Sequence, residues 1–238
     1  LFGYEGDTIA SALIANGIHL VGRSFKYHRP RGFFGAGVEE PNAKLQVEFN
    51  GHSEPNVNAT EMELVEGLSA TSQNCWPSVN FDIGAINNFL KMFFPAGFYY
   101  KTFMWPKSFW YKIYEPFIRK AAGLGVASIE KDKERYEHKF EYCDLLVTGS
   151  GPSGLASAYA AAKNGAKVIL AEDKPRFGGT LLTDDVSIDN LSGKDWAEKI
   201  ITELKSMPNV TVKNRSQVFG YYDHNMLVMF ERVSDHLE

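Results

Sequence analysis

Three glycines have the spacing of a turn that binds phosphate groups. Gly149, Gly151 and Gly154 form a G-x-G-x-x-G sequence within "LLVTGSGPSGLASAYAAAKNGAKVILAED". In such a turn the first glycine allows a tight bend, the second lets the backbone approach a pyrophosphate, and the third lets a helix pack against a strand. The spacing therefore predicts a dinucleotide site, and the alternative is a glycine-rich turn with no ligand.

An acidic residue stands where a dinucleotide fold needs one. Glu172 follows Gly149 by 23 residues, and a carboxylate there accepts hydrogen bonds from the adenosine ribose. It would repel a 2′-phosphate, which favours NAD or FAD over NADP, although Lys174 and Arg176 weaken that discrimination. The residues by themselves leave NAD and FAD open.

A second glycine pair in "RFGGT" is typical of flavoproteins with two dinucleotide-binding domains, where it also approaches the cofactor. The cofactor-binding residues expected from both patterns are Gly149, Gly151, Pro152, Ser153, Gly154, Glu172, Asp173, Lys174, Gly178, Gly179 and Thr180.

The elements around the turn alternate as a parallel fold requires. An apolar strand is expected at 145–148, an alanine-rich helix ending at Asn164-Gly165 follows, and a second strand is expected at 167–171. Residues 141–238 are therefore predicted to form the N-terminal half of an α/β Rossmann-type FAD/NAD-binding domain, which is incomplete here.

The N-terminal residues, 1–80, predict a small α+β unit. A helix is expected in "DTIASALIANG" with Asp7 or Thr8 as its N-cap, followed by "IHLVG" at 18–22, "KLQVEF" at 44–49, an Asn50-Gly51 turn and a strand at 60–65. The loop "RGFFGAGVEEPNA" at 31–43 reads like a plant-type ferredoxin loop without its cysteines. Because no thiolate precedes Cys75, we expect a ferredoxin-like domain without an iron–sulfur cluster.

An aromatic-rich connector is expected at 81–140. Thirteen aromatic residues lie between Phe89 and Phe117, while the longest uncharged run there, Met92 to Tyr100, has nine residues. A membrane helix needs about 20, so we expect no membrane span. The favoured interpretation is an interface with another domain or subunit, and a ligand-stacking surface is the alternative. The charged stretch at 130–142 is expected to be a solvated connector.

Composition restricts the remaining functions. The 238 residues carry a net charge of −4, which gives no global reason to bind nucleic acid. The only cysteines, Cys75 and Cys143, are too few for a disulfide scaffold or a four-cysteine metal site, so a cytoplasmic protein is expected. We assign no catalytic residue and no metal ligand. The chain begins with Leu1, and we interpret it as a fragment.

A basic loop, "RSFKYHRPRG", spans residues 23–32. Its interpretation as a solvated loop that pairs with acids such as Glu39 and Glu40 is favoured over a surface at the subunit interface that faces phosphate or flavin. His28 is not a candidate base, because no carboxylate partner is evident at a useful spacing.

Several long stretches resemble the N-terminal part of the α subunit of heterotetrameric sarcosine oxidase. They are "GDTIASALIANG", "VGRSFKYHRPRG", "EEPNA", "FYYKTFMWP", "YEPFIRKAAGLG", the region from Asp144 to Leu182, and "FGYYDHN". The resemblance covers nearly the whole chain in order.

The resemblance implies an oxidoreductase that acts on the CH–NH group of donors with oxygen as acceptor. Sarcosine would be demethylated to glycine, with formaldehyde or methylene-tetrahydrofolate and hydrogen peroxide as products. It implies NAD in the dinucleotide-binding domain of this chain, with FAD as the alternative there. It also implies FAD in a β subunit, FMN at the interface of α and β, smaller subunits, and tetrahydrofolate bound in a C-terminal region absent from this chain. The alternatives are the α subunit of a related amine, proline or opine dehydrogenase, or a non-catalytic nucleotide-binding assembly module.

Overall fold

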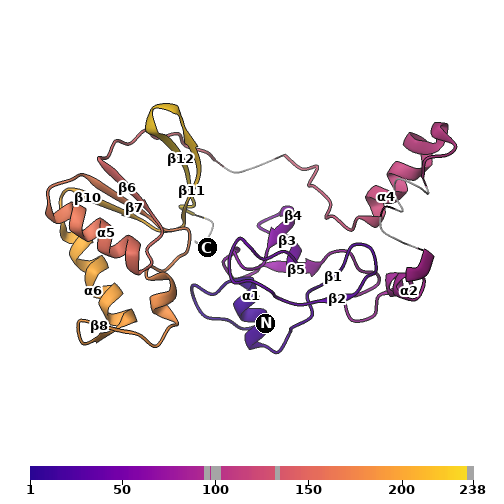
Figure 1. Cartoon of the computed structure of the whole chain (residues 1–238), viewed down its shortest axis with the longest axis horizontal. Helices are drawn as coiled ribbons and strands as arrows, with labels where there is room; N and C mark the ends of the chain where they lie inside the picture. Colours follow the sequence, from indigo (N-terminus) through magenta and orange to yellow (C-terminus); the bar gives the residue numbers. More distant parts are fainter. Residues whose placement is uncertain (94–96, 98–102, 132–134, 235–238) are drawn as a thin grey trace. The chain divides into compact units, whose positions relative to one another are not determined.

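The computed structural model describes residues 1–93, 97, 103–131 and 135–234. The chain divides into two compact units, Leu1–Glu134 and Arg135–Glu238 (Figure 1). Each unit is described by itself below.

The first helix of unit 1 begins as its sequence indicates. Helix α1 (Ile9–Ala15) has Thr8 as its N-cap, whose Oγ1 accepts a hydrogen bond from the Ser11 N–H at 3.2 Å. The Ser11 hydroxyl oxygen in turn accepts from the Thr8 N–H at 2.9 Å, which completes a capping box. The helix ends at Asn16, and Gly17 follows with φ 77°. The predicted helix is confirmed.

An antiparallel sheet covers the apolar face of α1 in unit 1. Strands β3 (Lys44–Phe49), β4 (His52–Asn58) and β5 (Ser69–Ser72) lie in the order β4-β3-β5. The predicted Asn50-Gly51 turn joins β3 to β4, with φ 49° and 78° at its two residues. A two-residue ladder joins β1 (Gly22–Arg23) and β2 (Pro30–Arg31), so only the end of the expected 18–22 segment is a strand. The buried core comprises Ile9, Ala10, Val21, Ala43, Leu45, Val47 and Ala59.

The strand expected at 60–65 is wrong. The N–H groups of Glu61 and Met62 both donate to the Asn58 carbonyl, which makes a turn. The segment then pairs with the start of α1 instead of a sheet, because Ile9 N–H donates to the Met62 carbonyl at 3.0 Å. Apolar and acidic residues do alternate from Glu61 to Leu64, but the backbone of this segment hydrogen-bonds to the N-terminus of α1 and not to a neighbouring strand.

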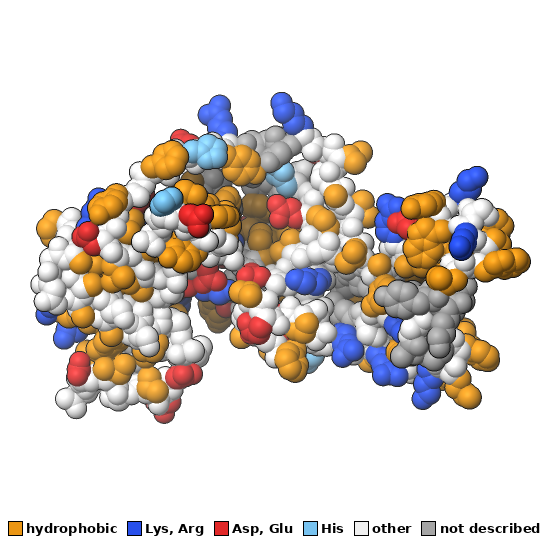
Figure 2. Space-filling view, turned by 45° about the horizontal axis from the view of Figure 1, so that its top comes forward, with side chains coloured by type: hydrophobic (Ala, Val, Ile, Leu, Met, Phe, Trp, Pro, Cys, Tyr) orange, Lys and Arg blue, Asp and Glu red, His pale blue; other side chains and the backbone are white. Residues whose placement is uncertain are grey.

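Short helical pieces make up the described part of the aromatic connector. They are η1 (Ile83–Ala85), α2 (Ile86–Phe89), η2 (Lys91–Phe93), η3 (Lys107–Phe109), the π-helix η4 (Trp110–Tyr114) and α4 (Glu115–Ala121). Its large side chains are mostly exposed: Phe89 is 83% accessible, Trp105 81% and Tyr111 82%. Figure 2 shows orange side chains beside blue ones over α2 and α4, at the right of the view. The expected aromatics at 94, 98, 99 and 100 lie outside the described residues.

The interface interpretation of this segment stays a prediction. A soluble monomer seldom exposes an apolar patch beyond several hundred Å². We therefore expect the 238-residue chain, produced alone, to self-associate and to enhance the fluorescence of a hydrophobic dye. Light scattering and dye titration check this, and a dye-silent monomer at high concentration would contradict it.

Unit 2 contains a parallel sheet with its helices. Strands β6 (Leu145–Thr148), β7 (Val168–Ala171) and β10 (Val210–Lys213) lie in the order β10-β7-β6, with helices α5 (Pro152–Lys163) and α6 (Gly193–Ser206) between them in the chain. The predicted strands and the helix end at Asn164-Gly165 are confirmed. The remaining elements are η5 (Gly179–Leu182), β8 (Ser187–Ile188), β9 (Leu191–Ser192), and the hairpin of β11 (Ser216–Tyr222) and β12 (Met226–Glu231) around η6 (Asp223–Asn225).

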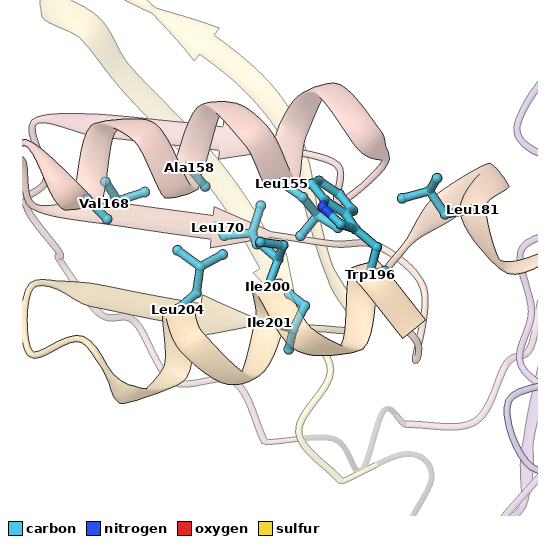
Figure 3. Close-up of a cluster of buried hydrophobic side chains, with 11 residues drawn as sticks. Leu155, Ala158, Val168, Leu170, Leu181, Trp196, Ile200, Ile201 and Leu204 are labelled. Carbon is cyan, nitrogen blue, oxygen red and sulfur yellow. The ribbon is translucent and has the colours of Figure 1, made fainter. Parts of the chain in front are cut away.

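The core of unit 2 lies between α5, β7 and α6. Figure 3 shows Leu155, Leu170 and Trp196 pointing into the same space, and Leu204 lies further along it. All four strand residues of β7 are buried, which explains its continuous apolar run "VILA". This packing fixes the turn between β6 and α5 against the end of β7.

The charged connector has no helix or strand in its described part, and its described side chains from 130 to 142 are exposed. Residues 132–134 lie outside the described range. No helix in the described part of the chain is long and apolar enough to cross a membrane.

Candidate dinucleotide site

The turn between β6 and α5 is built from glycines with different constraints. Gly149 has φ 88°, a left-handed conformation that favours glycine. A Cβ atom added at Gly154 would lie 2.0 Å from the Gly149 carbonyl oxygen, so the start of α5 lies directly on the turn. This is the close helix–strand packing expected of the third glycine.

The outer side of the same turn is open. Apart from Gly151 and its two chain neighbours, no described residue has an atom within 4 Å of a Cβ added at Gly151, which is the N-cap of α5 and has no side-chain cap. The first N–H groups of a helix have no partners within the helix and favour anions. The turn therefore leaves room for a phosphate group beside the N-terminus of a 12-residue helix.

The second glycine pair closes on the first. Gly178 has φ 125° and Gly179 has φ 54°. A Cβ atom added at Gly179 would lie 3.1 Å from the Gly151 Cα, and the Gly178 N–H donates to the Ser150 hydroxyl at 2.9 Å. The two loops, 28 residues apart in sequence, thus form one edge of the site.

Glu172 directly follows β7, beside the turn, and is 5% exposed. Its Oε2 accepts hydrogen bonds from the Ser150 N–H at 2.7 Å and from the Ser150 hydroxyl, and its Oε1 accepts from the Lys174 N–H at 3.1 Å. Burial raises the pKa of the Glu172 carboxyl, and the neighbouring Asp173 carboxyl acts in the same direction. The expected ribose acid is therefore already held by three protein donors.

The other expected site residues lie at the rim. Pro152, Ser153, Gly179 and Thr180 are exposed, and Asp173 and Lys174 are half-buried with Nζ 3.7 Å from Oδ2. Burial alone would raise the pKa of Asp173, but its hydrogen bond with Glu172 and the charge of Lys174 lower it.

Sequence reasoning missed Ser150, which is fully buried and connects all three parts of the site. The G-x-G-x-x-G motif gives no indication of this role, because any residue is allowed between its first two glycines. A buried hydroxyl needs partners, but the sequence does not show that they come from residues 172 and 178.

The statement that His28 has no carboxylate partner is wrong. Its Nδ1 lies 2.7 Å from the Asp82 Oδ2, and the Asp82 carboxylate is almost fully buried. Asp82 Oδ1 also accepts from the N–H groups of Trp76 and Gly84, each at 3.1 Å. The pair connects the basic loop to the segment that follows the small domain. A separation of 54 residues concealed it from any local pattern.

Two arginines of the basic loop donate hydrogen bonds to other residues of unit 1. The Arg23 guanidinium donates to the Val79 carbonyl at 2.6 and 2.8 Å, and Arg29 donates to Asn88 at 3.0 Å. The Arg29 guanidinium also lies 4.8 Å from the centroid of the Tyr27 ring. The acids that the sequence suggested as partners instead bind the backbone of their own loop, as Glu40 does with four N–H groups.

Two family models match this chain. Residues 1–75 match a 2Fe-2S iron-sulfur cluster binding domain, and residues 144–221 match the FAD dependent oxidoreductases. These matches overturn the expectations of NAD and of a domain family without a cluster. The glycine turn and terminal acid are common to NAD-binding and FAD-binding domains, so they could not discriminate between the two.

The residues present fit the two implied groups differently. The open Gly151, the start of α5 and Glu172 fit the adenosine diphosphate half of FAD. A 2Fe-2S cluster is usually held by four cysteine thiolates, whereas residues 1–75 contain one cysteine, Cys75. Within the described residues, no group of three or more His, Cys, Asp or Glu is placed to hold a metal ion. One cysteine does not supply the ligand set of such a cluster.

A solved structure supports the fold. L-proline dehydrogenase from P. horikoshii matches 96% of this chain and 34% of its own chain with a TM-score of 0.55 and 16% sequence identity. That similarity concerns the fold alone.

Curated relatives match in sequence. The sarcosine oxidase subunit alpha of Rhizobium meliloti (strain 1021) is 56% identical over 235 residues, which are 99% of this chain and 24% of the relative. The subunit alpha of Corynebacterium sp. (strain U-96) is 31% identical over 242 residues, or 100% of this chain and 20% of the relative. The chain spans a quarter or less of these relatives, and over nearly all of its own length it is a homologue of sarcosine oxidase α subunits.

Proposed function

We propose that this chain binds FAD at the Gly149–Gly154 turn and is part of the α subunit of a complex that oxidises sarcosine. The observation that carries the proposal is the geometry of the two glycine loops, which meet at Gly151 and leave its outer side open. The 56% identity to a sarcosine oxidase α subunit supports the substrate.

The residues take distinct roles in this proposal. Gly149 makes the bend, Gly151 admits the pyrophosphate, and the first N–H groups of α5 at Ser153 and Gly154 face it. Glu172 accepts a hydrogen bond from the adenosine ribose. The remaining residues that would border the nucleotide are the buried Gly178 and the rim residues Pro152, Asp173, Lys174, Gly179 and Thr180. Bound FAD supplies an acceptor for two electrons.

The proposed reaction is the oxidative demethylation of sarcosine to glycine with oxygen as acceptor. Formaldehyde or methylene-tetrahydrofolate, together with hydrogen peroxide, would be the other products. A β subunit and smaller subunits would complete a heterotetramer, and tetrahydrofolate would bind in a region outside this chain. Oxygen uptake by the purified complex with sarcosine tests the reaction, and no uptake with sarcosine would contradict it.

Gly151→Val tests the nucleotide site. The backbone of Gly151 has φ −63° and ψ −179°, which valine adopts, and no described atom lies near the added Cβ. We therefore expect normal folding, but the branched side chain fills the space of the pyrophosphate. FAD affinity should fall by at least about tenfold, or about 1.4 kcal/mol. Flavin absorbance and chromatography of the released nucleotide measure the bound amount.

The matched control is Ala156→Val, which adds the same side chain on an exposed position of α5. It should retain full flavin content. Equal flavin content in Gly151→Val and in the control would show that the nucleotide lies elsewhere.

A further inference from the structure

We propose that Ser150 is a positioning residue that fixes the Glu172 carboxylate and the Gly178–Gly179 loop for nucleotide binding. This inference rests on the proposed function, because it concerns how the same site is held in shape. The position lies between the first two glycines of the turn.

The hydroxyl of Ser150 has partners on both sides. It accepts a hydrogen bond from the Gly178 N–H at 2.9 Å and donates to Glu172 Oε2. The residue is 0% exposed, so this hydroxyl is withdrawn from water and depends on these two bonds. A glycine or alanine at position 150 would lose both bonds.

These bonds restrict what Glu172 can offer a ligand. Oε2 accepts both the N–H and the hydroxyl of Ser150, which occupy its two lone-pair directions. Oε1 accepts from the Lys174 N–H, and the neighbouring Asp173 carboxyl also hydrogen-bonds with Glu172, so a ribose hydroxyl has to be received on the Oε1 side of the carboxylate. Ser150 thereby sets which carboxylate oxygen receives the ligand and holds the carboxylate in place before the ligand arrives.

The same hydroxyl orders the second loop. Gly178 and Gly179 both have positive φ, and a free loop of two glycines has a large conformational entropy. The bond from the Gly178 N–H to Ser150 holds this loop beside Gly151. The two are so close that a Cβ added at Gly179 would lie 3.1 Å from the Gly151 Cα. An ordered loop costs less entropy when the nucleotide binds.

The test uses Ser150→Ala in the full-length subunit within its complex, with Ser157→Ala as control. Ser157 lies exposed on α5 and receives the same change. We expect Ser150→Ala to weaken FAD binding about tenfold and Ser157→Ala to leave it unchanged. In a Glu172→Gln background, Ser150→Ala should have a smaller effect than in the wild type, because only the contribution through the Gly178 N–H remains.

Hydrogen exchange of nucleotide-free protein gives a second readout. Ser150→Ala should accelerate exchange at Gly178 and through residues 178–182, while amides within β7 and α6 keep their protection. Acceleration throughout the unit would show a general stability role and overturn the proposal, as would unchanged exchange at Gly178. A wild-type complex without bound dinucleotide would refute the proposed function, whereas the exchange result would still decide whether Ser150 orders the loop.

Discussion

Glu40→Gln is expected to destabilise unit 1 by about 4 kcal/mol, because two backbone donors would lose their acceptor. The Glu40 side chain is 1% exposed. Its Oε2 accepts from the N–H groups of Phe34 and Gly35, each at 2.6 Å, and its Oε1 accepts from Asn42 at 2.6 Å and Ala43 at 3.2 Å. A glutamine has one oxygen and one NH₂ group, so it can satisfy only one of these two pairs.

The adjacent carboxylate provides the control. Glu39 is exposed, and its Oε1 alone accepts from the N–H groups of Ala36 and Gly37, at 2.8 and 3.0 Å. Because one oxygen serves both donors, Glu39→Gln can keep both bonds and should leave the unfolding midpoint unchanged. Denaturant unfolding and hydrogen exchange at residues 34, 35, 42 and 43 measure the difference. Equal behaviour of the two variants would show that the Glu40 charge does not hold the loop.

The same carboxylate predicts a dependence on pH. Burial alone would raise the pKa of Glu40, but the four backbone donors outweigh it and lower the pKa below the ordinary value of 4.5. A lowered folded-state pKa adds stability that is present above the unfolded-state pKa and is lost as the pH falls through the folded-state pKa. Unit 1 should therefore lose stability in mild acid, and Glu40→Gln should reduce this loss.

Local patterns predicted the elements whose partners are near in sequence. The Thr8 cap, the Asn50-Gly51 turn and the β6–α5–β7 unit each depend on residues within one element or at one turn. The loop at 31–43 resembles a ferredoxin loop in its sequence. The sequence did not predict that the backbone of this loop surrounds the carboxylate of its own Glu40, because a glutamate beside an asparagine-containing turn usually faces water.

Contacts between distant residues could not be predicted in this way. His28 pairs with Asp82 across 54 residues, and Ser150 connects to Glu172 and Gly178 across 22 and 28. The prediction of a strand at 60–65 was wrong for the same reason, since this segment hydrogen-bonds to the start of α1. The choice between NAD and FAD failed for a different reason: both present the same adenosine diphosphate to the turn.

Gly154→Ala should destabilise unit 2 by about 3 kcal/mol, the upper part of the range for overpacking. The added Cβ would lie 2.0 Å from the Gly149 carbonyl oxygen, a backbone atom that cannot rotate away. Relief requires α5 to move from β6, and α5 carries the buried Leu155 and Ala158. For a unit of about 100 residues, the melting temperature should fall by roughly 10 °C or more.

Gly151→Ala is the matched comparison, because the same methyl group enters the same turn three residues earlier. It meets no described atom within 4 Å, so the melting temperature of nucleotide-free protein should stay unchanged. Flavin binding should weaken in both variants, but for different reasons: Gly154→Ala displaces the helix, whereas Gly151→Ala narrows the space for the pyrophosphate. Calorimetry of nucleotide-free protein separates these causes. If Gly154→Ala melted at the wild-type temperature, α5 would not depend on contact with the turn, and the N-terminus of the helix would not be fixed beside the phosphate site.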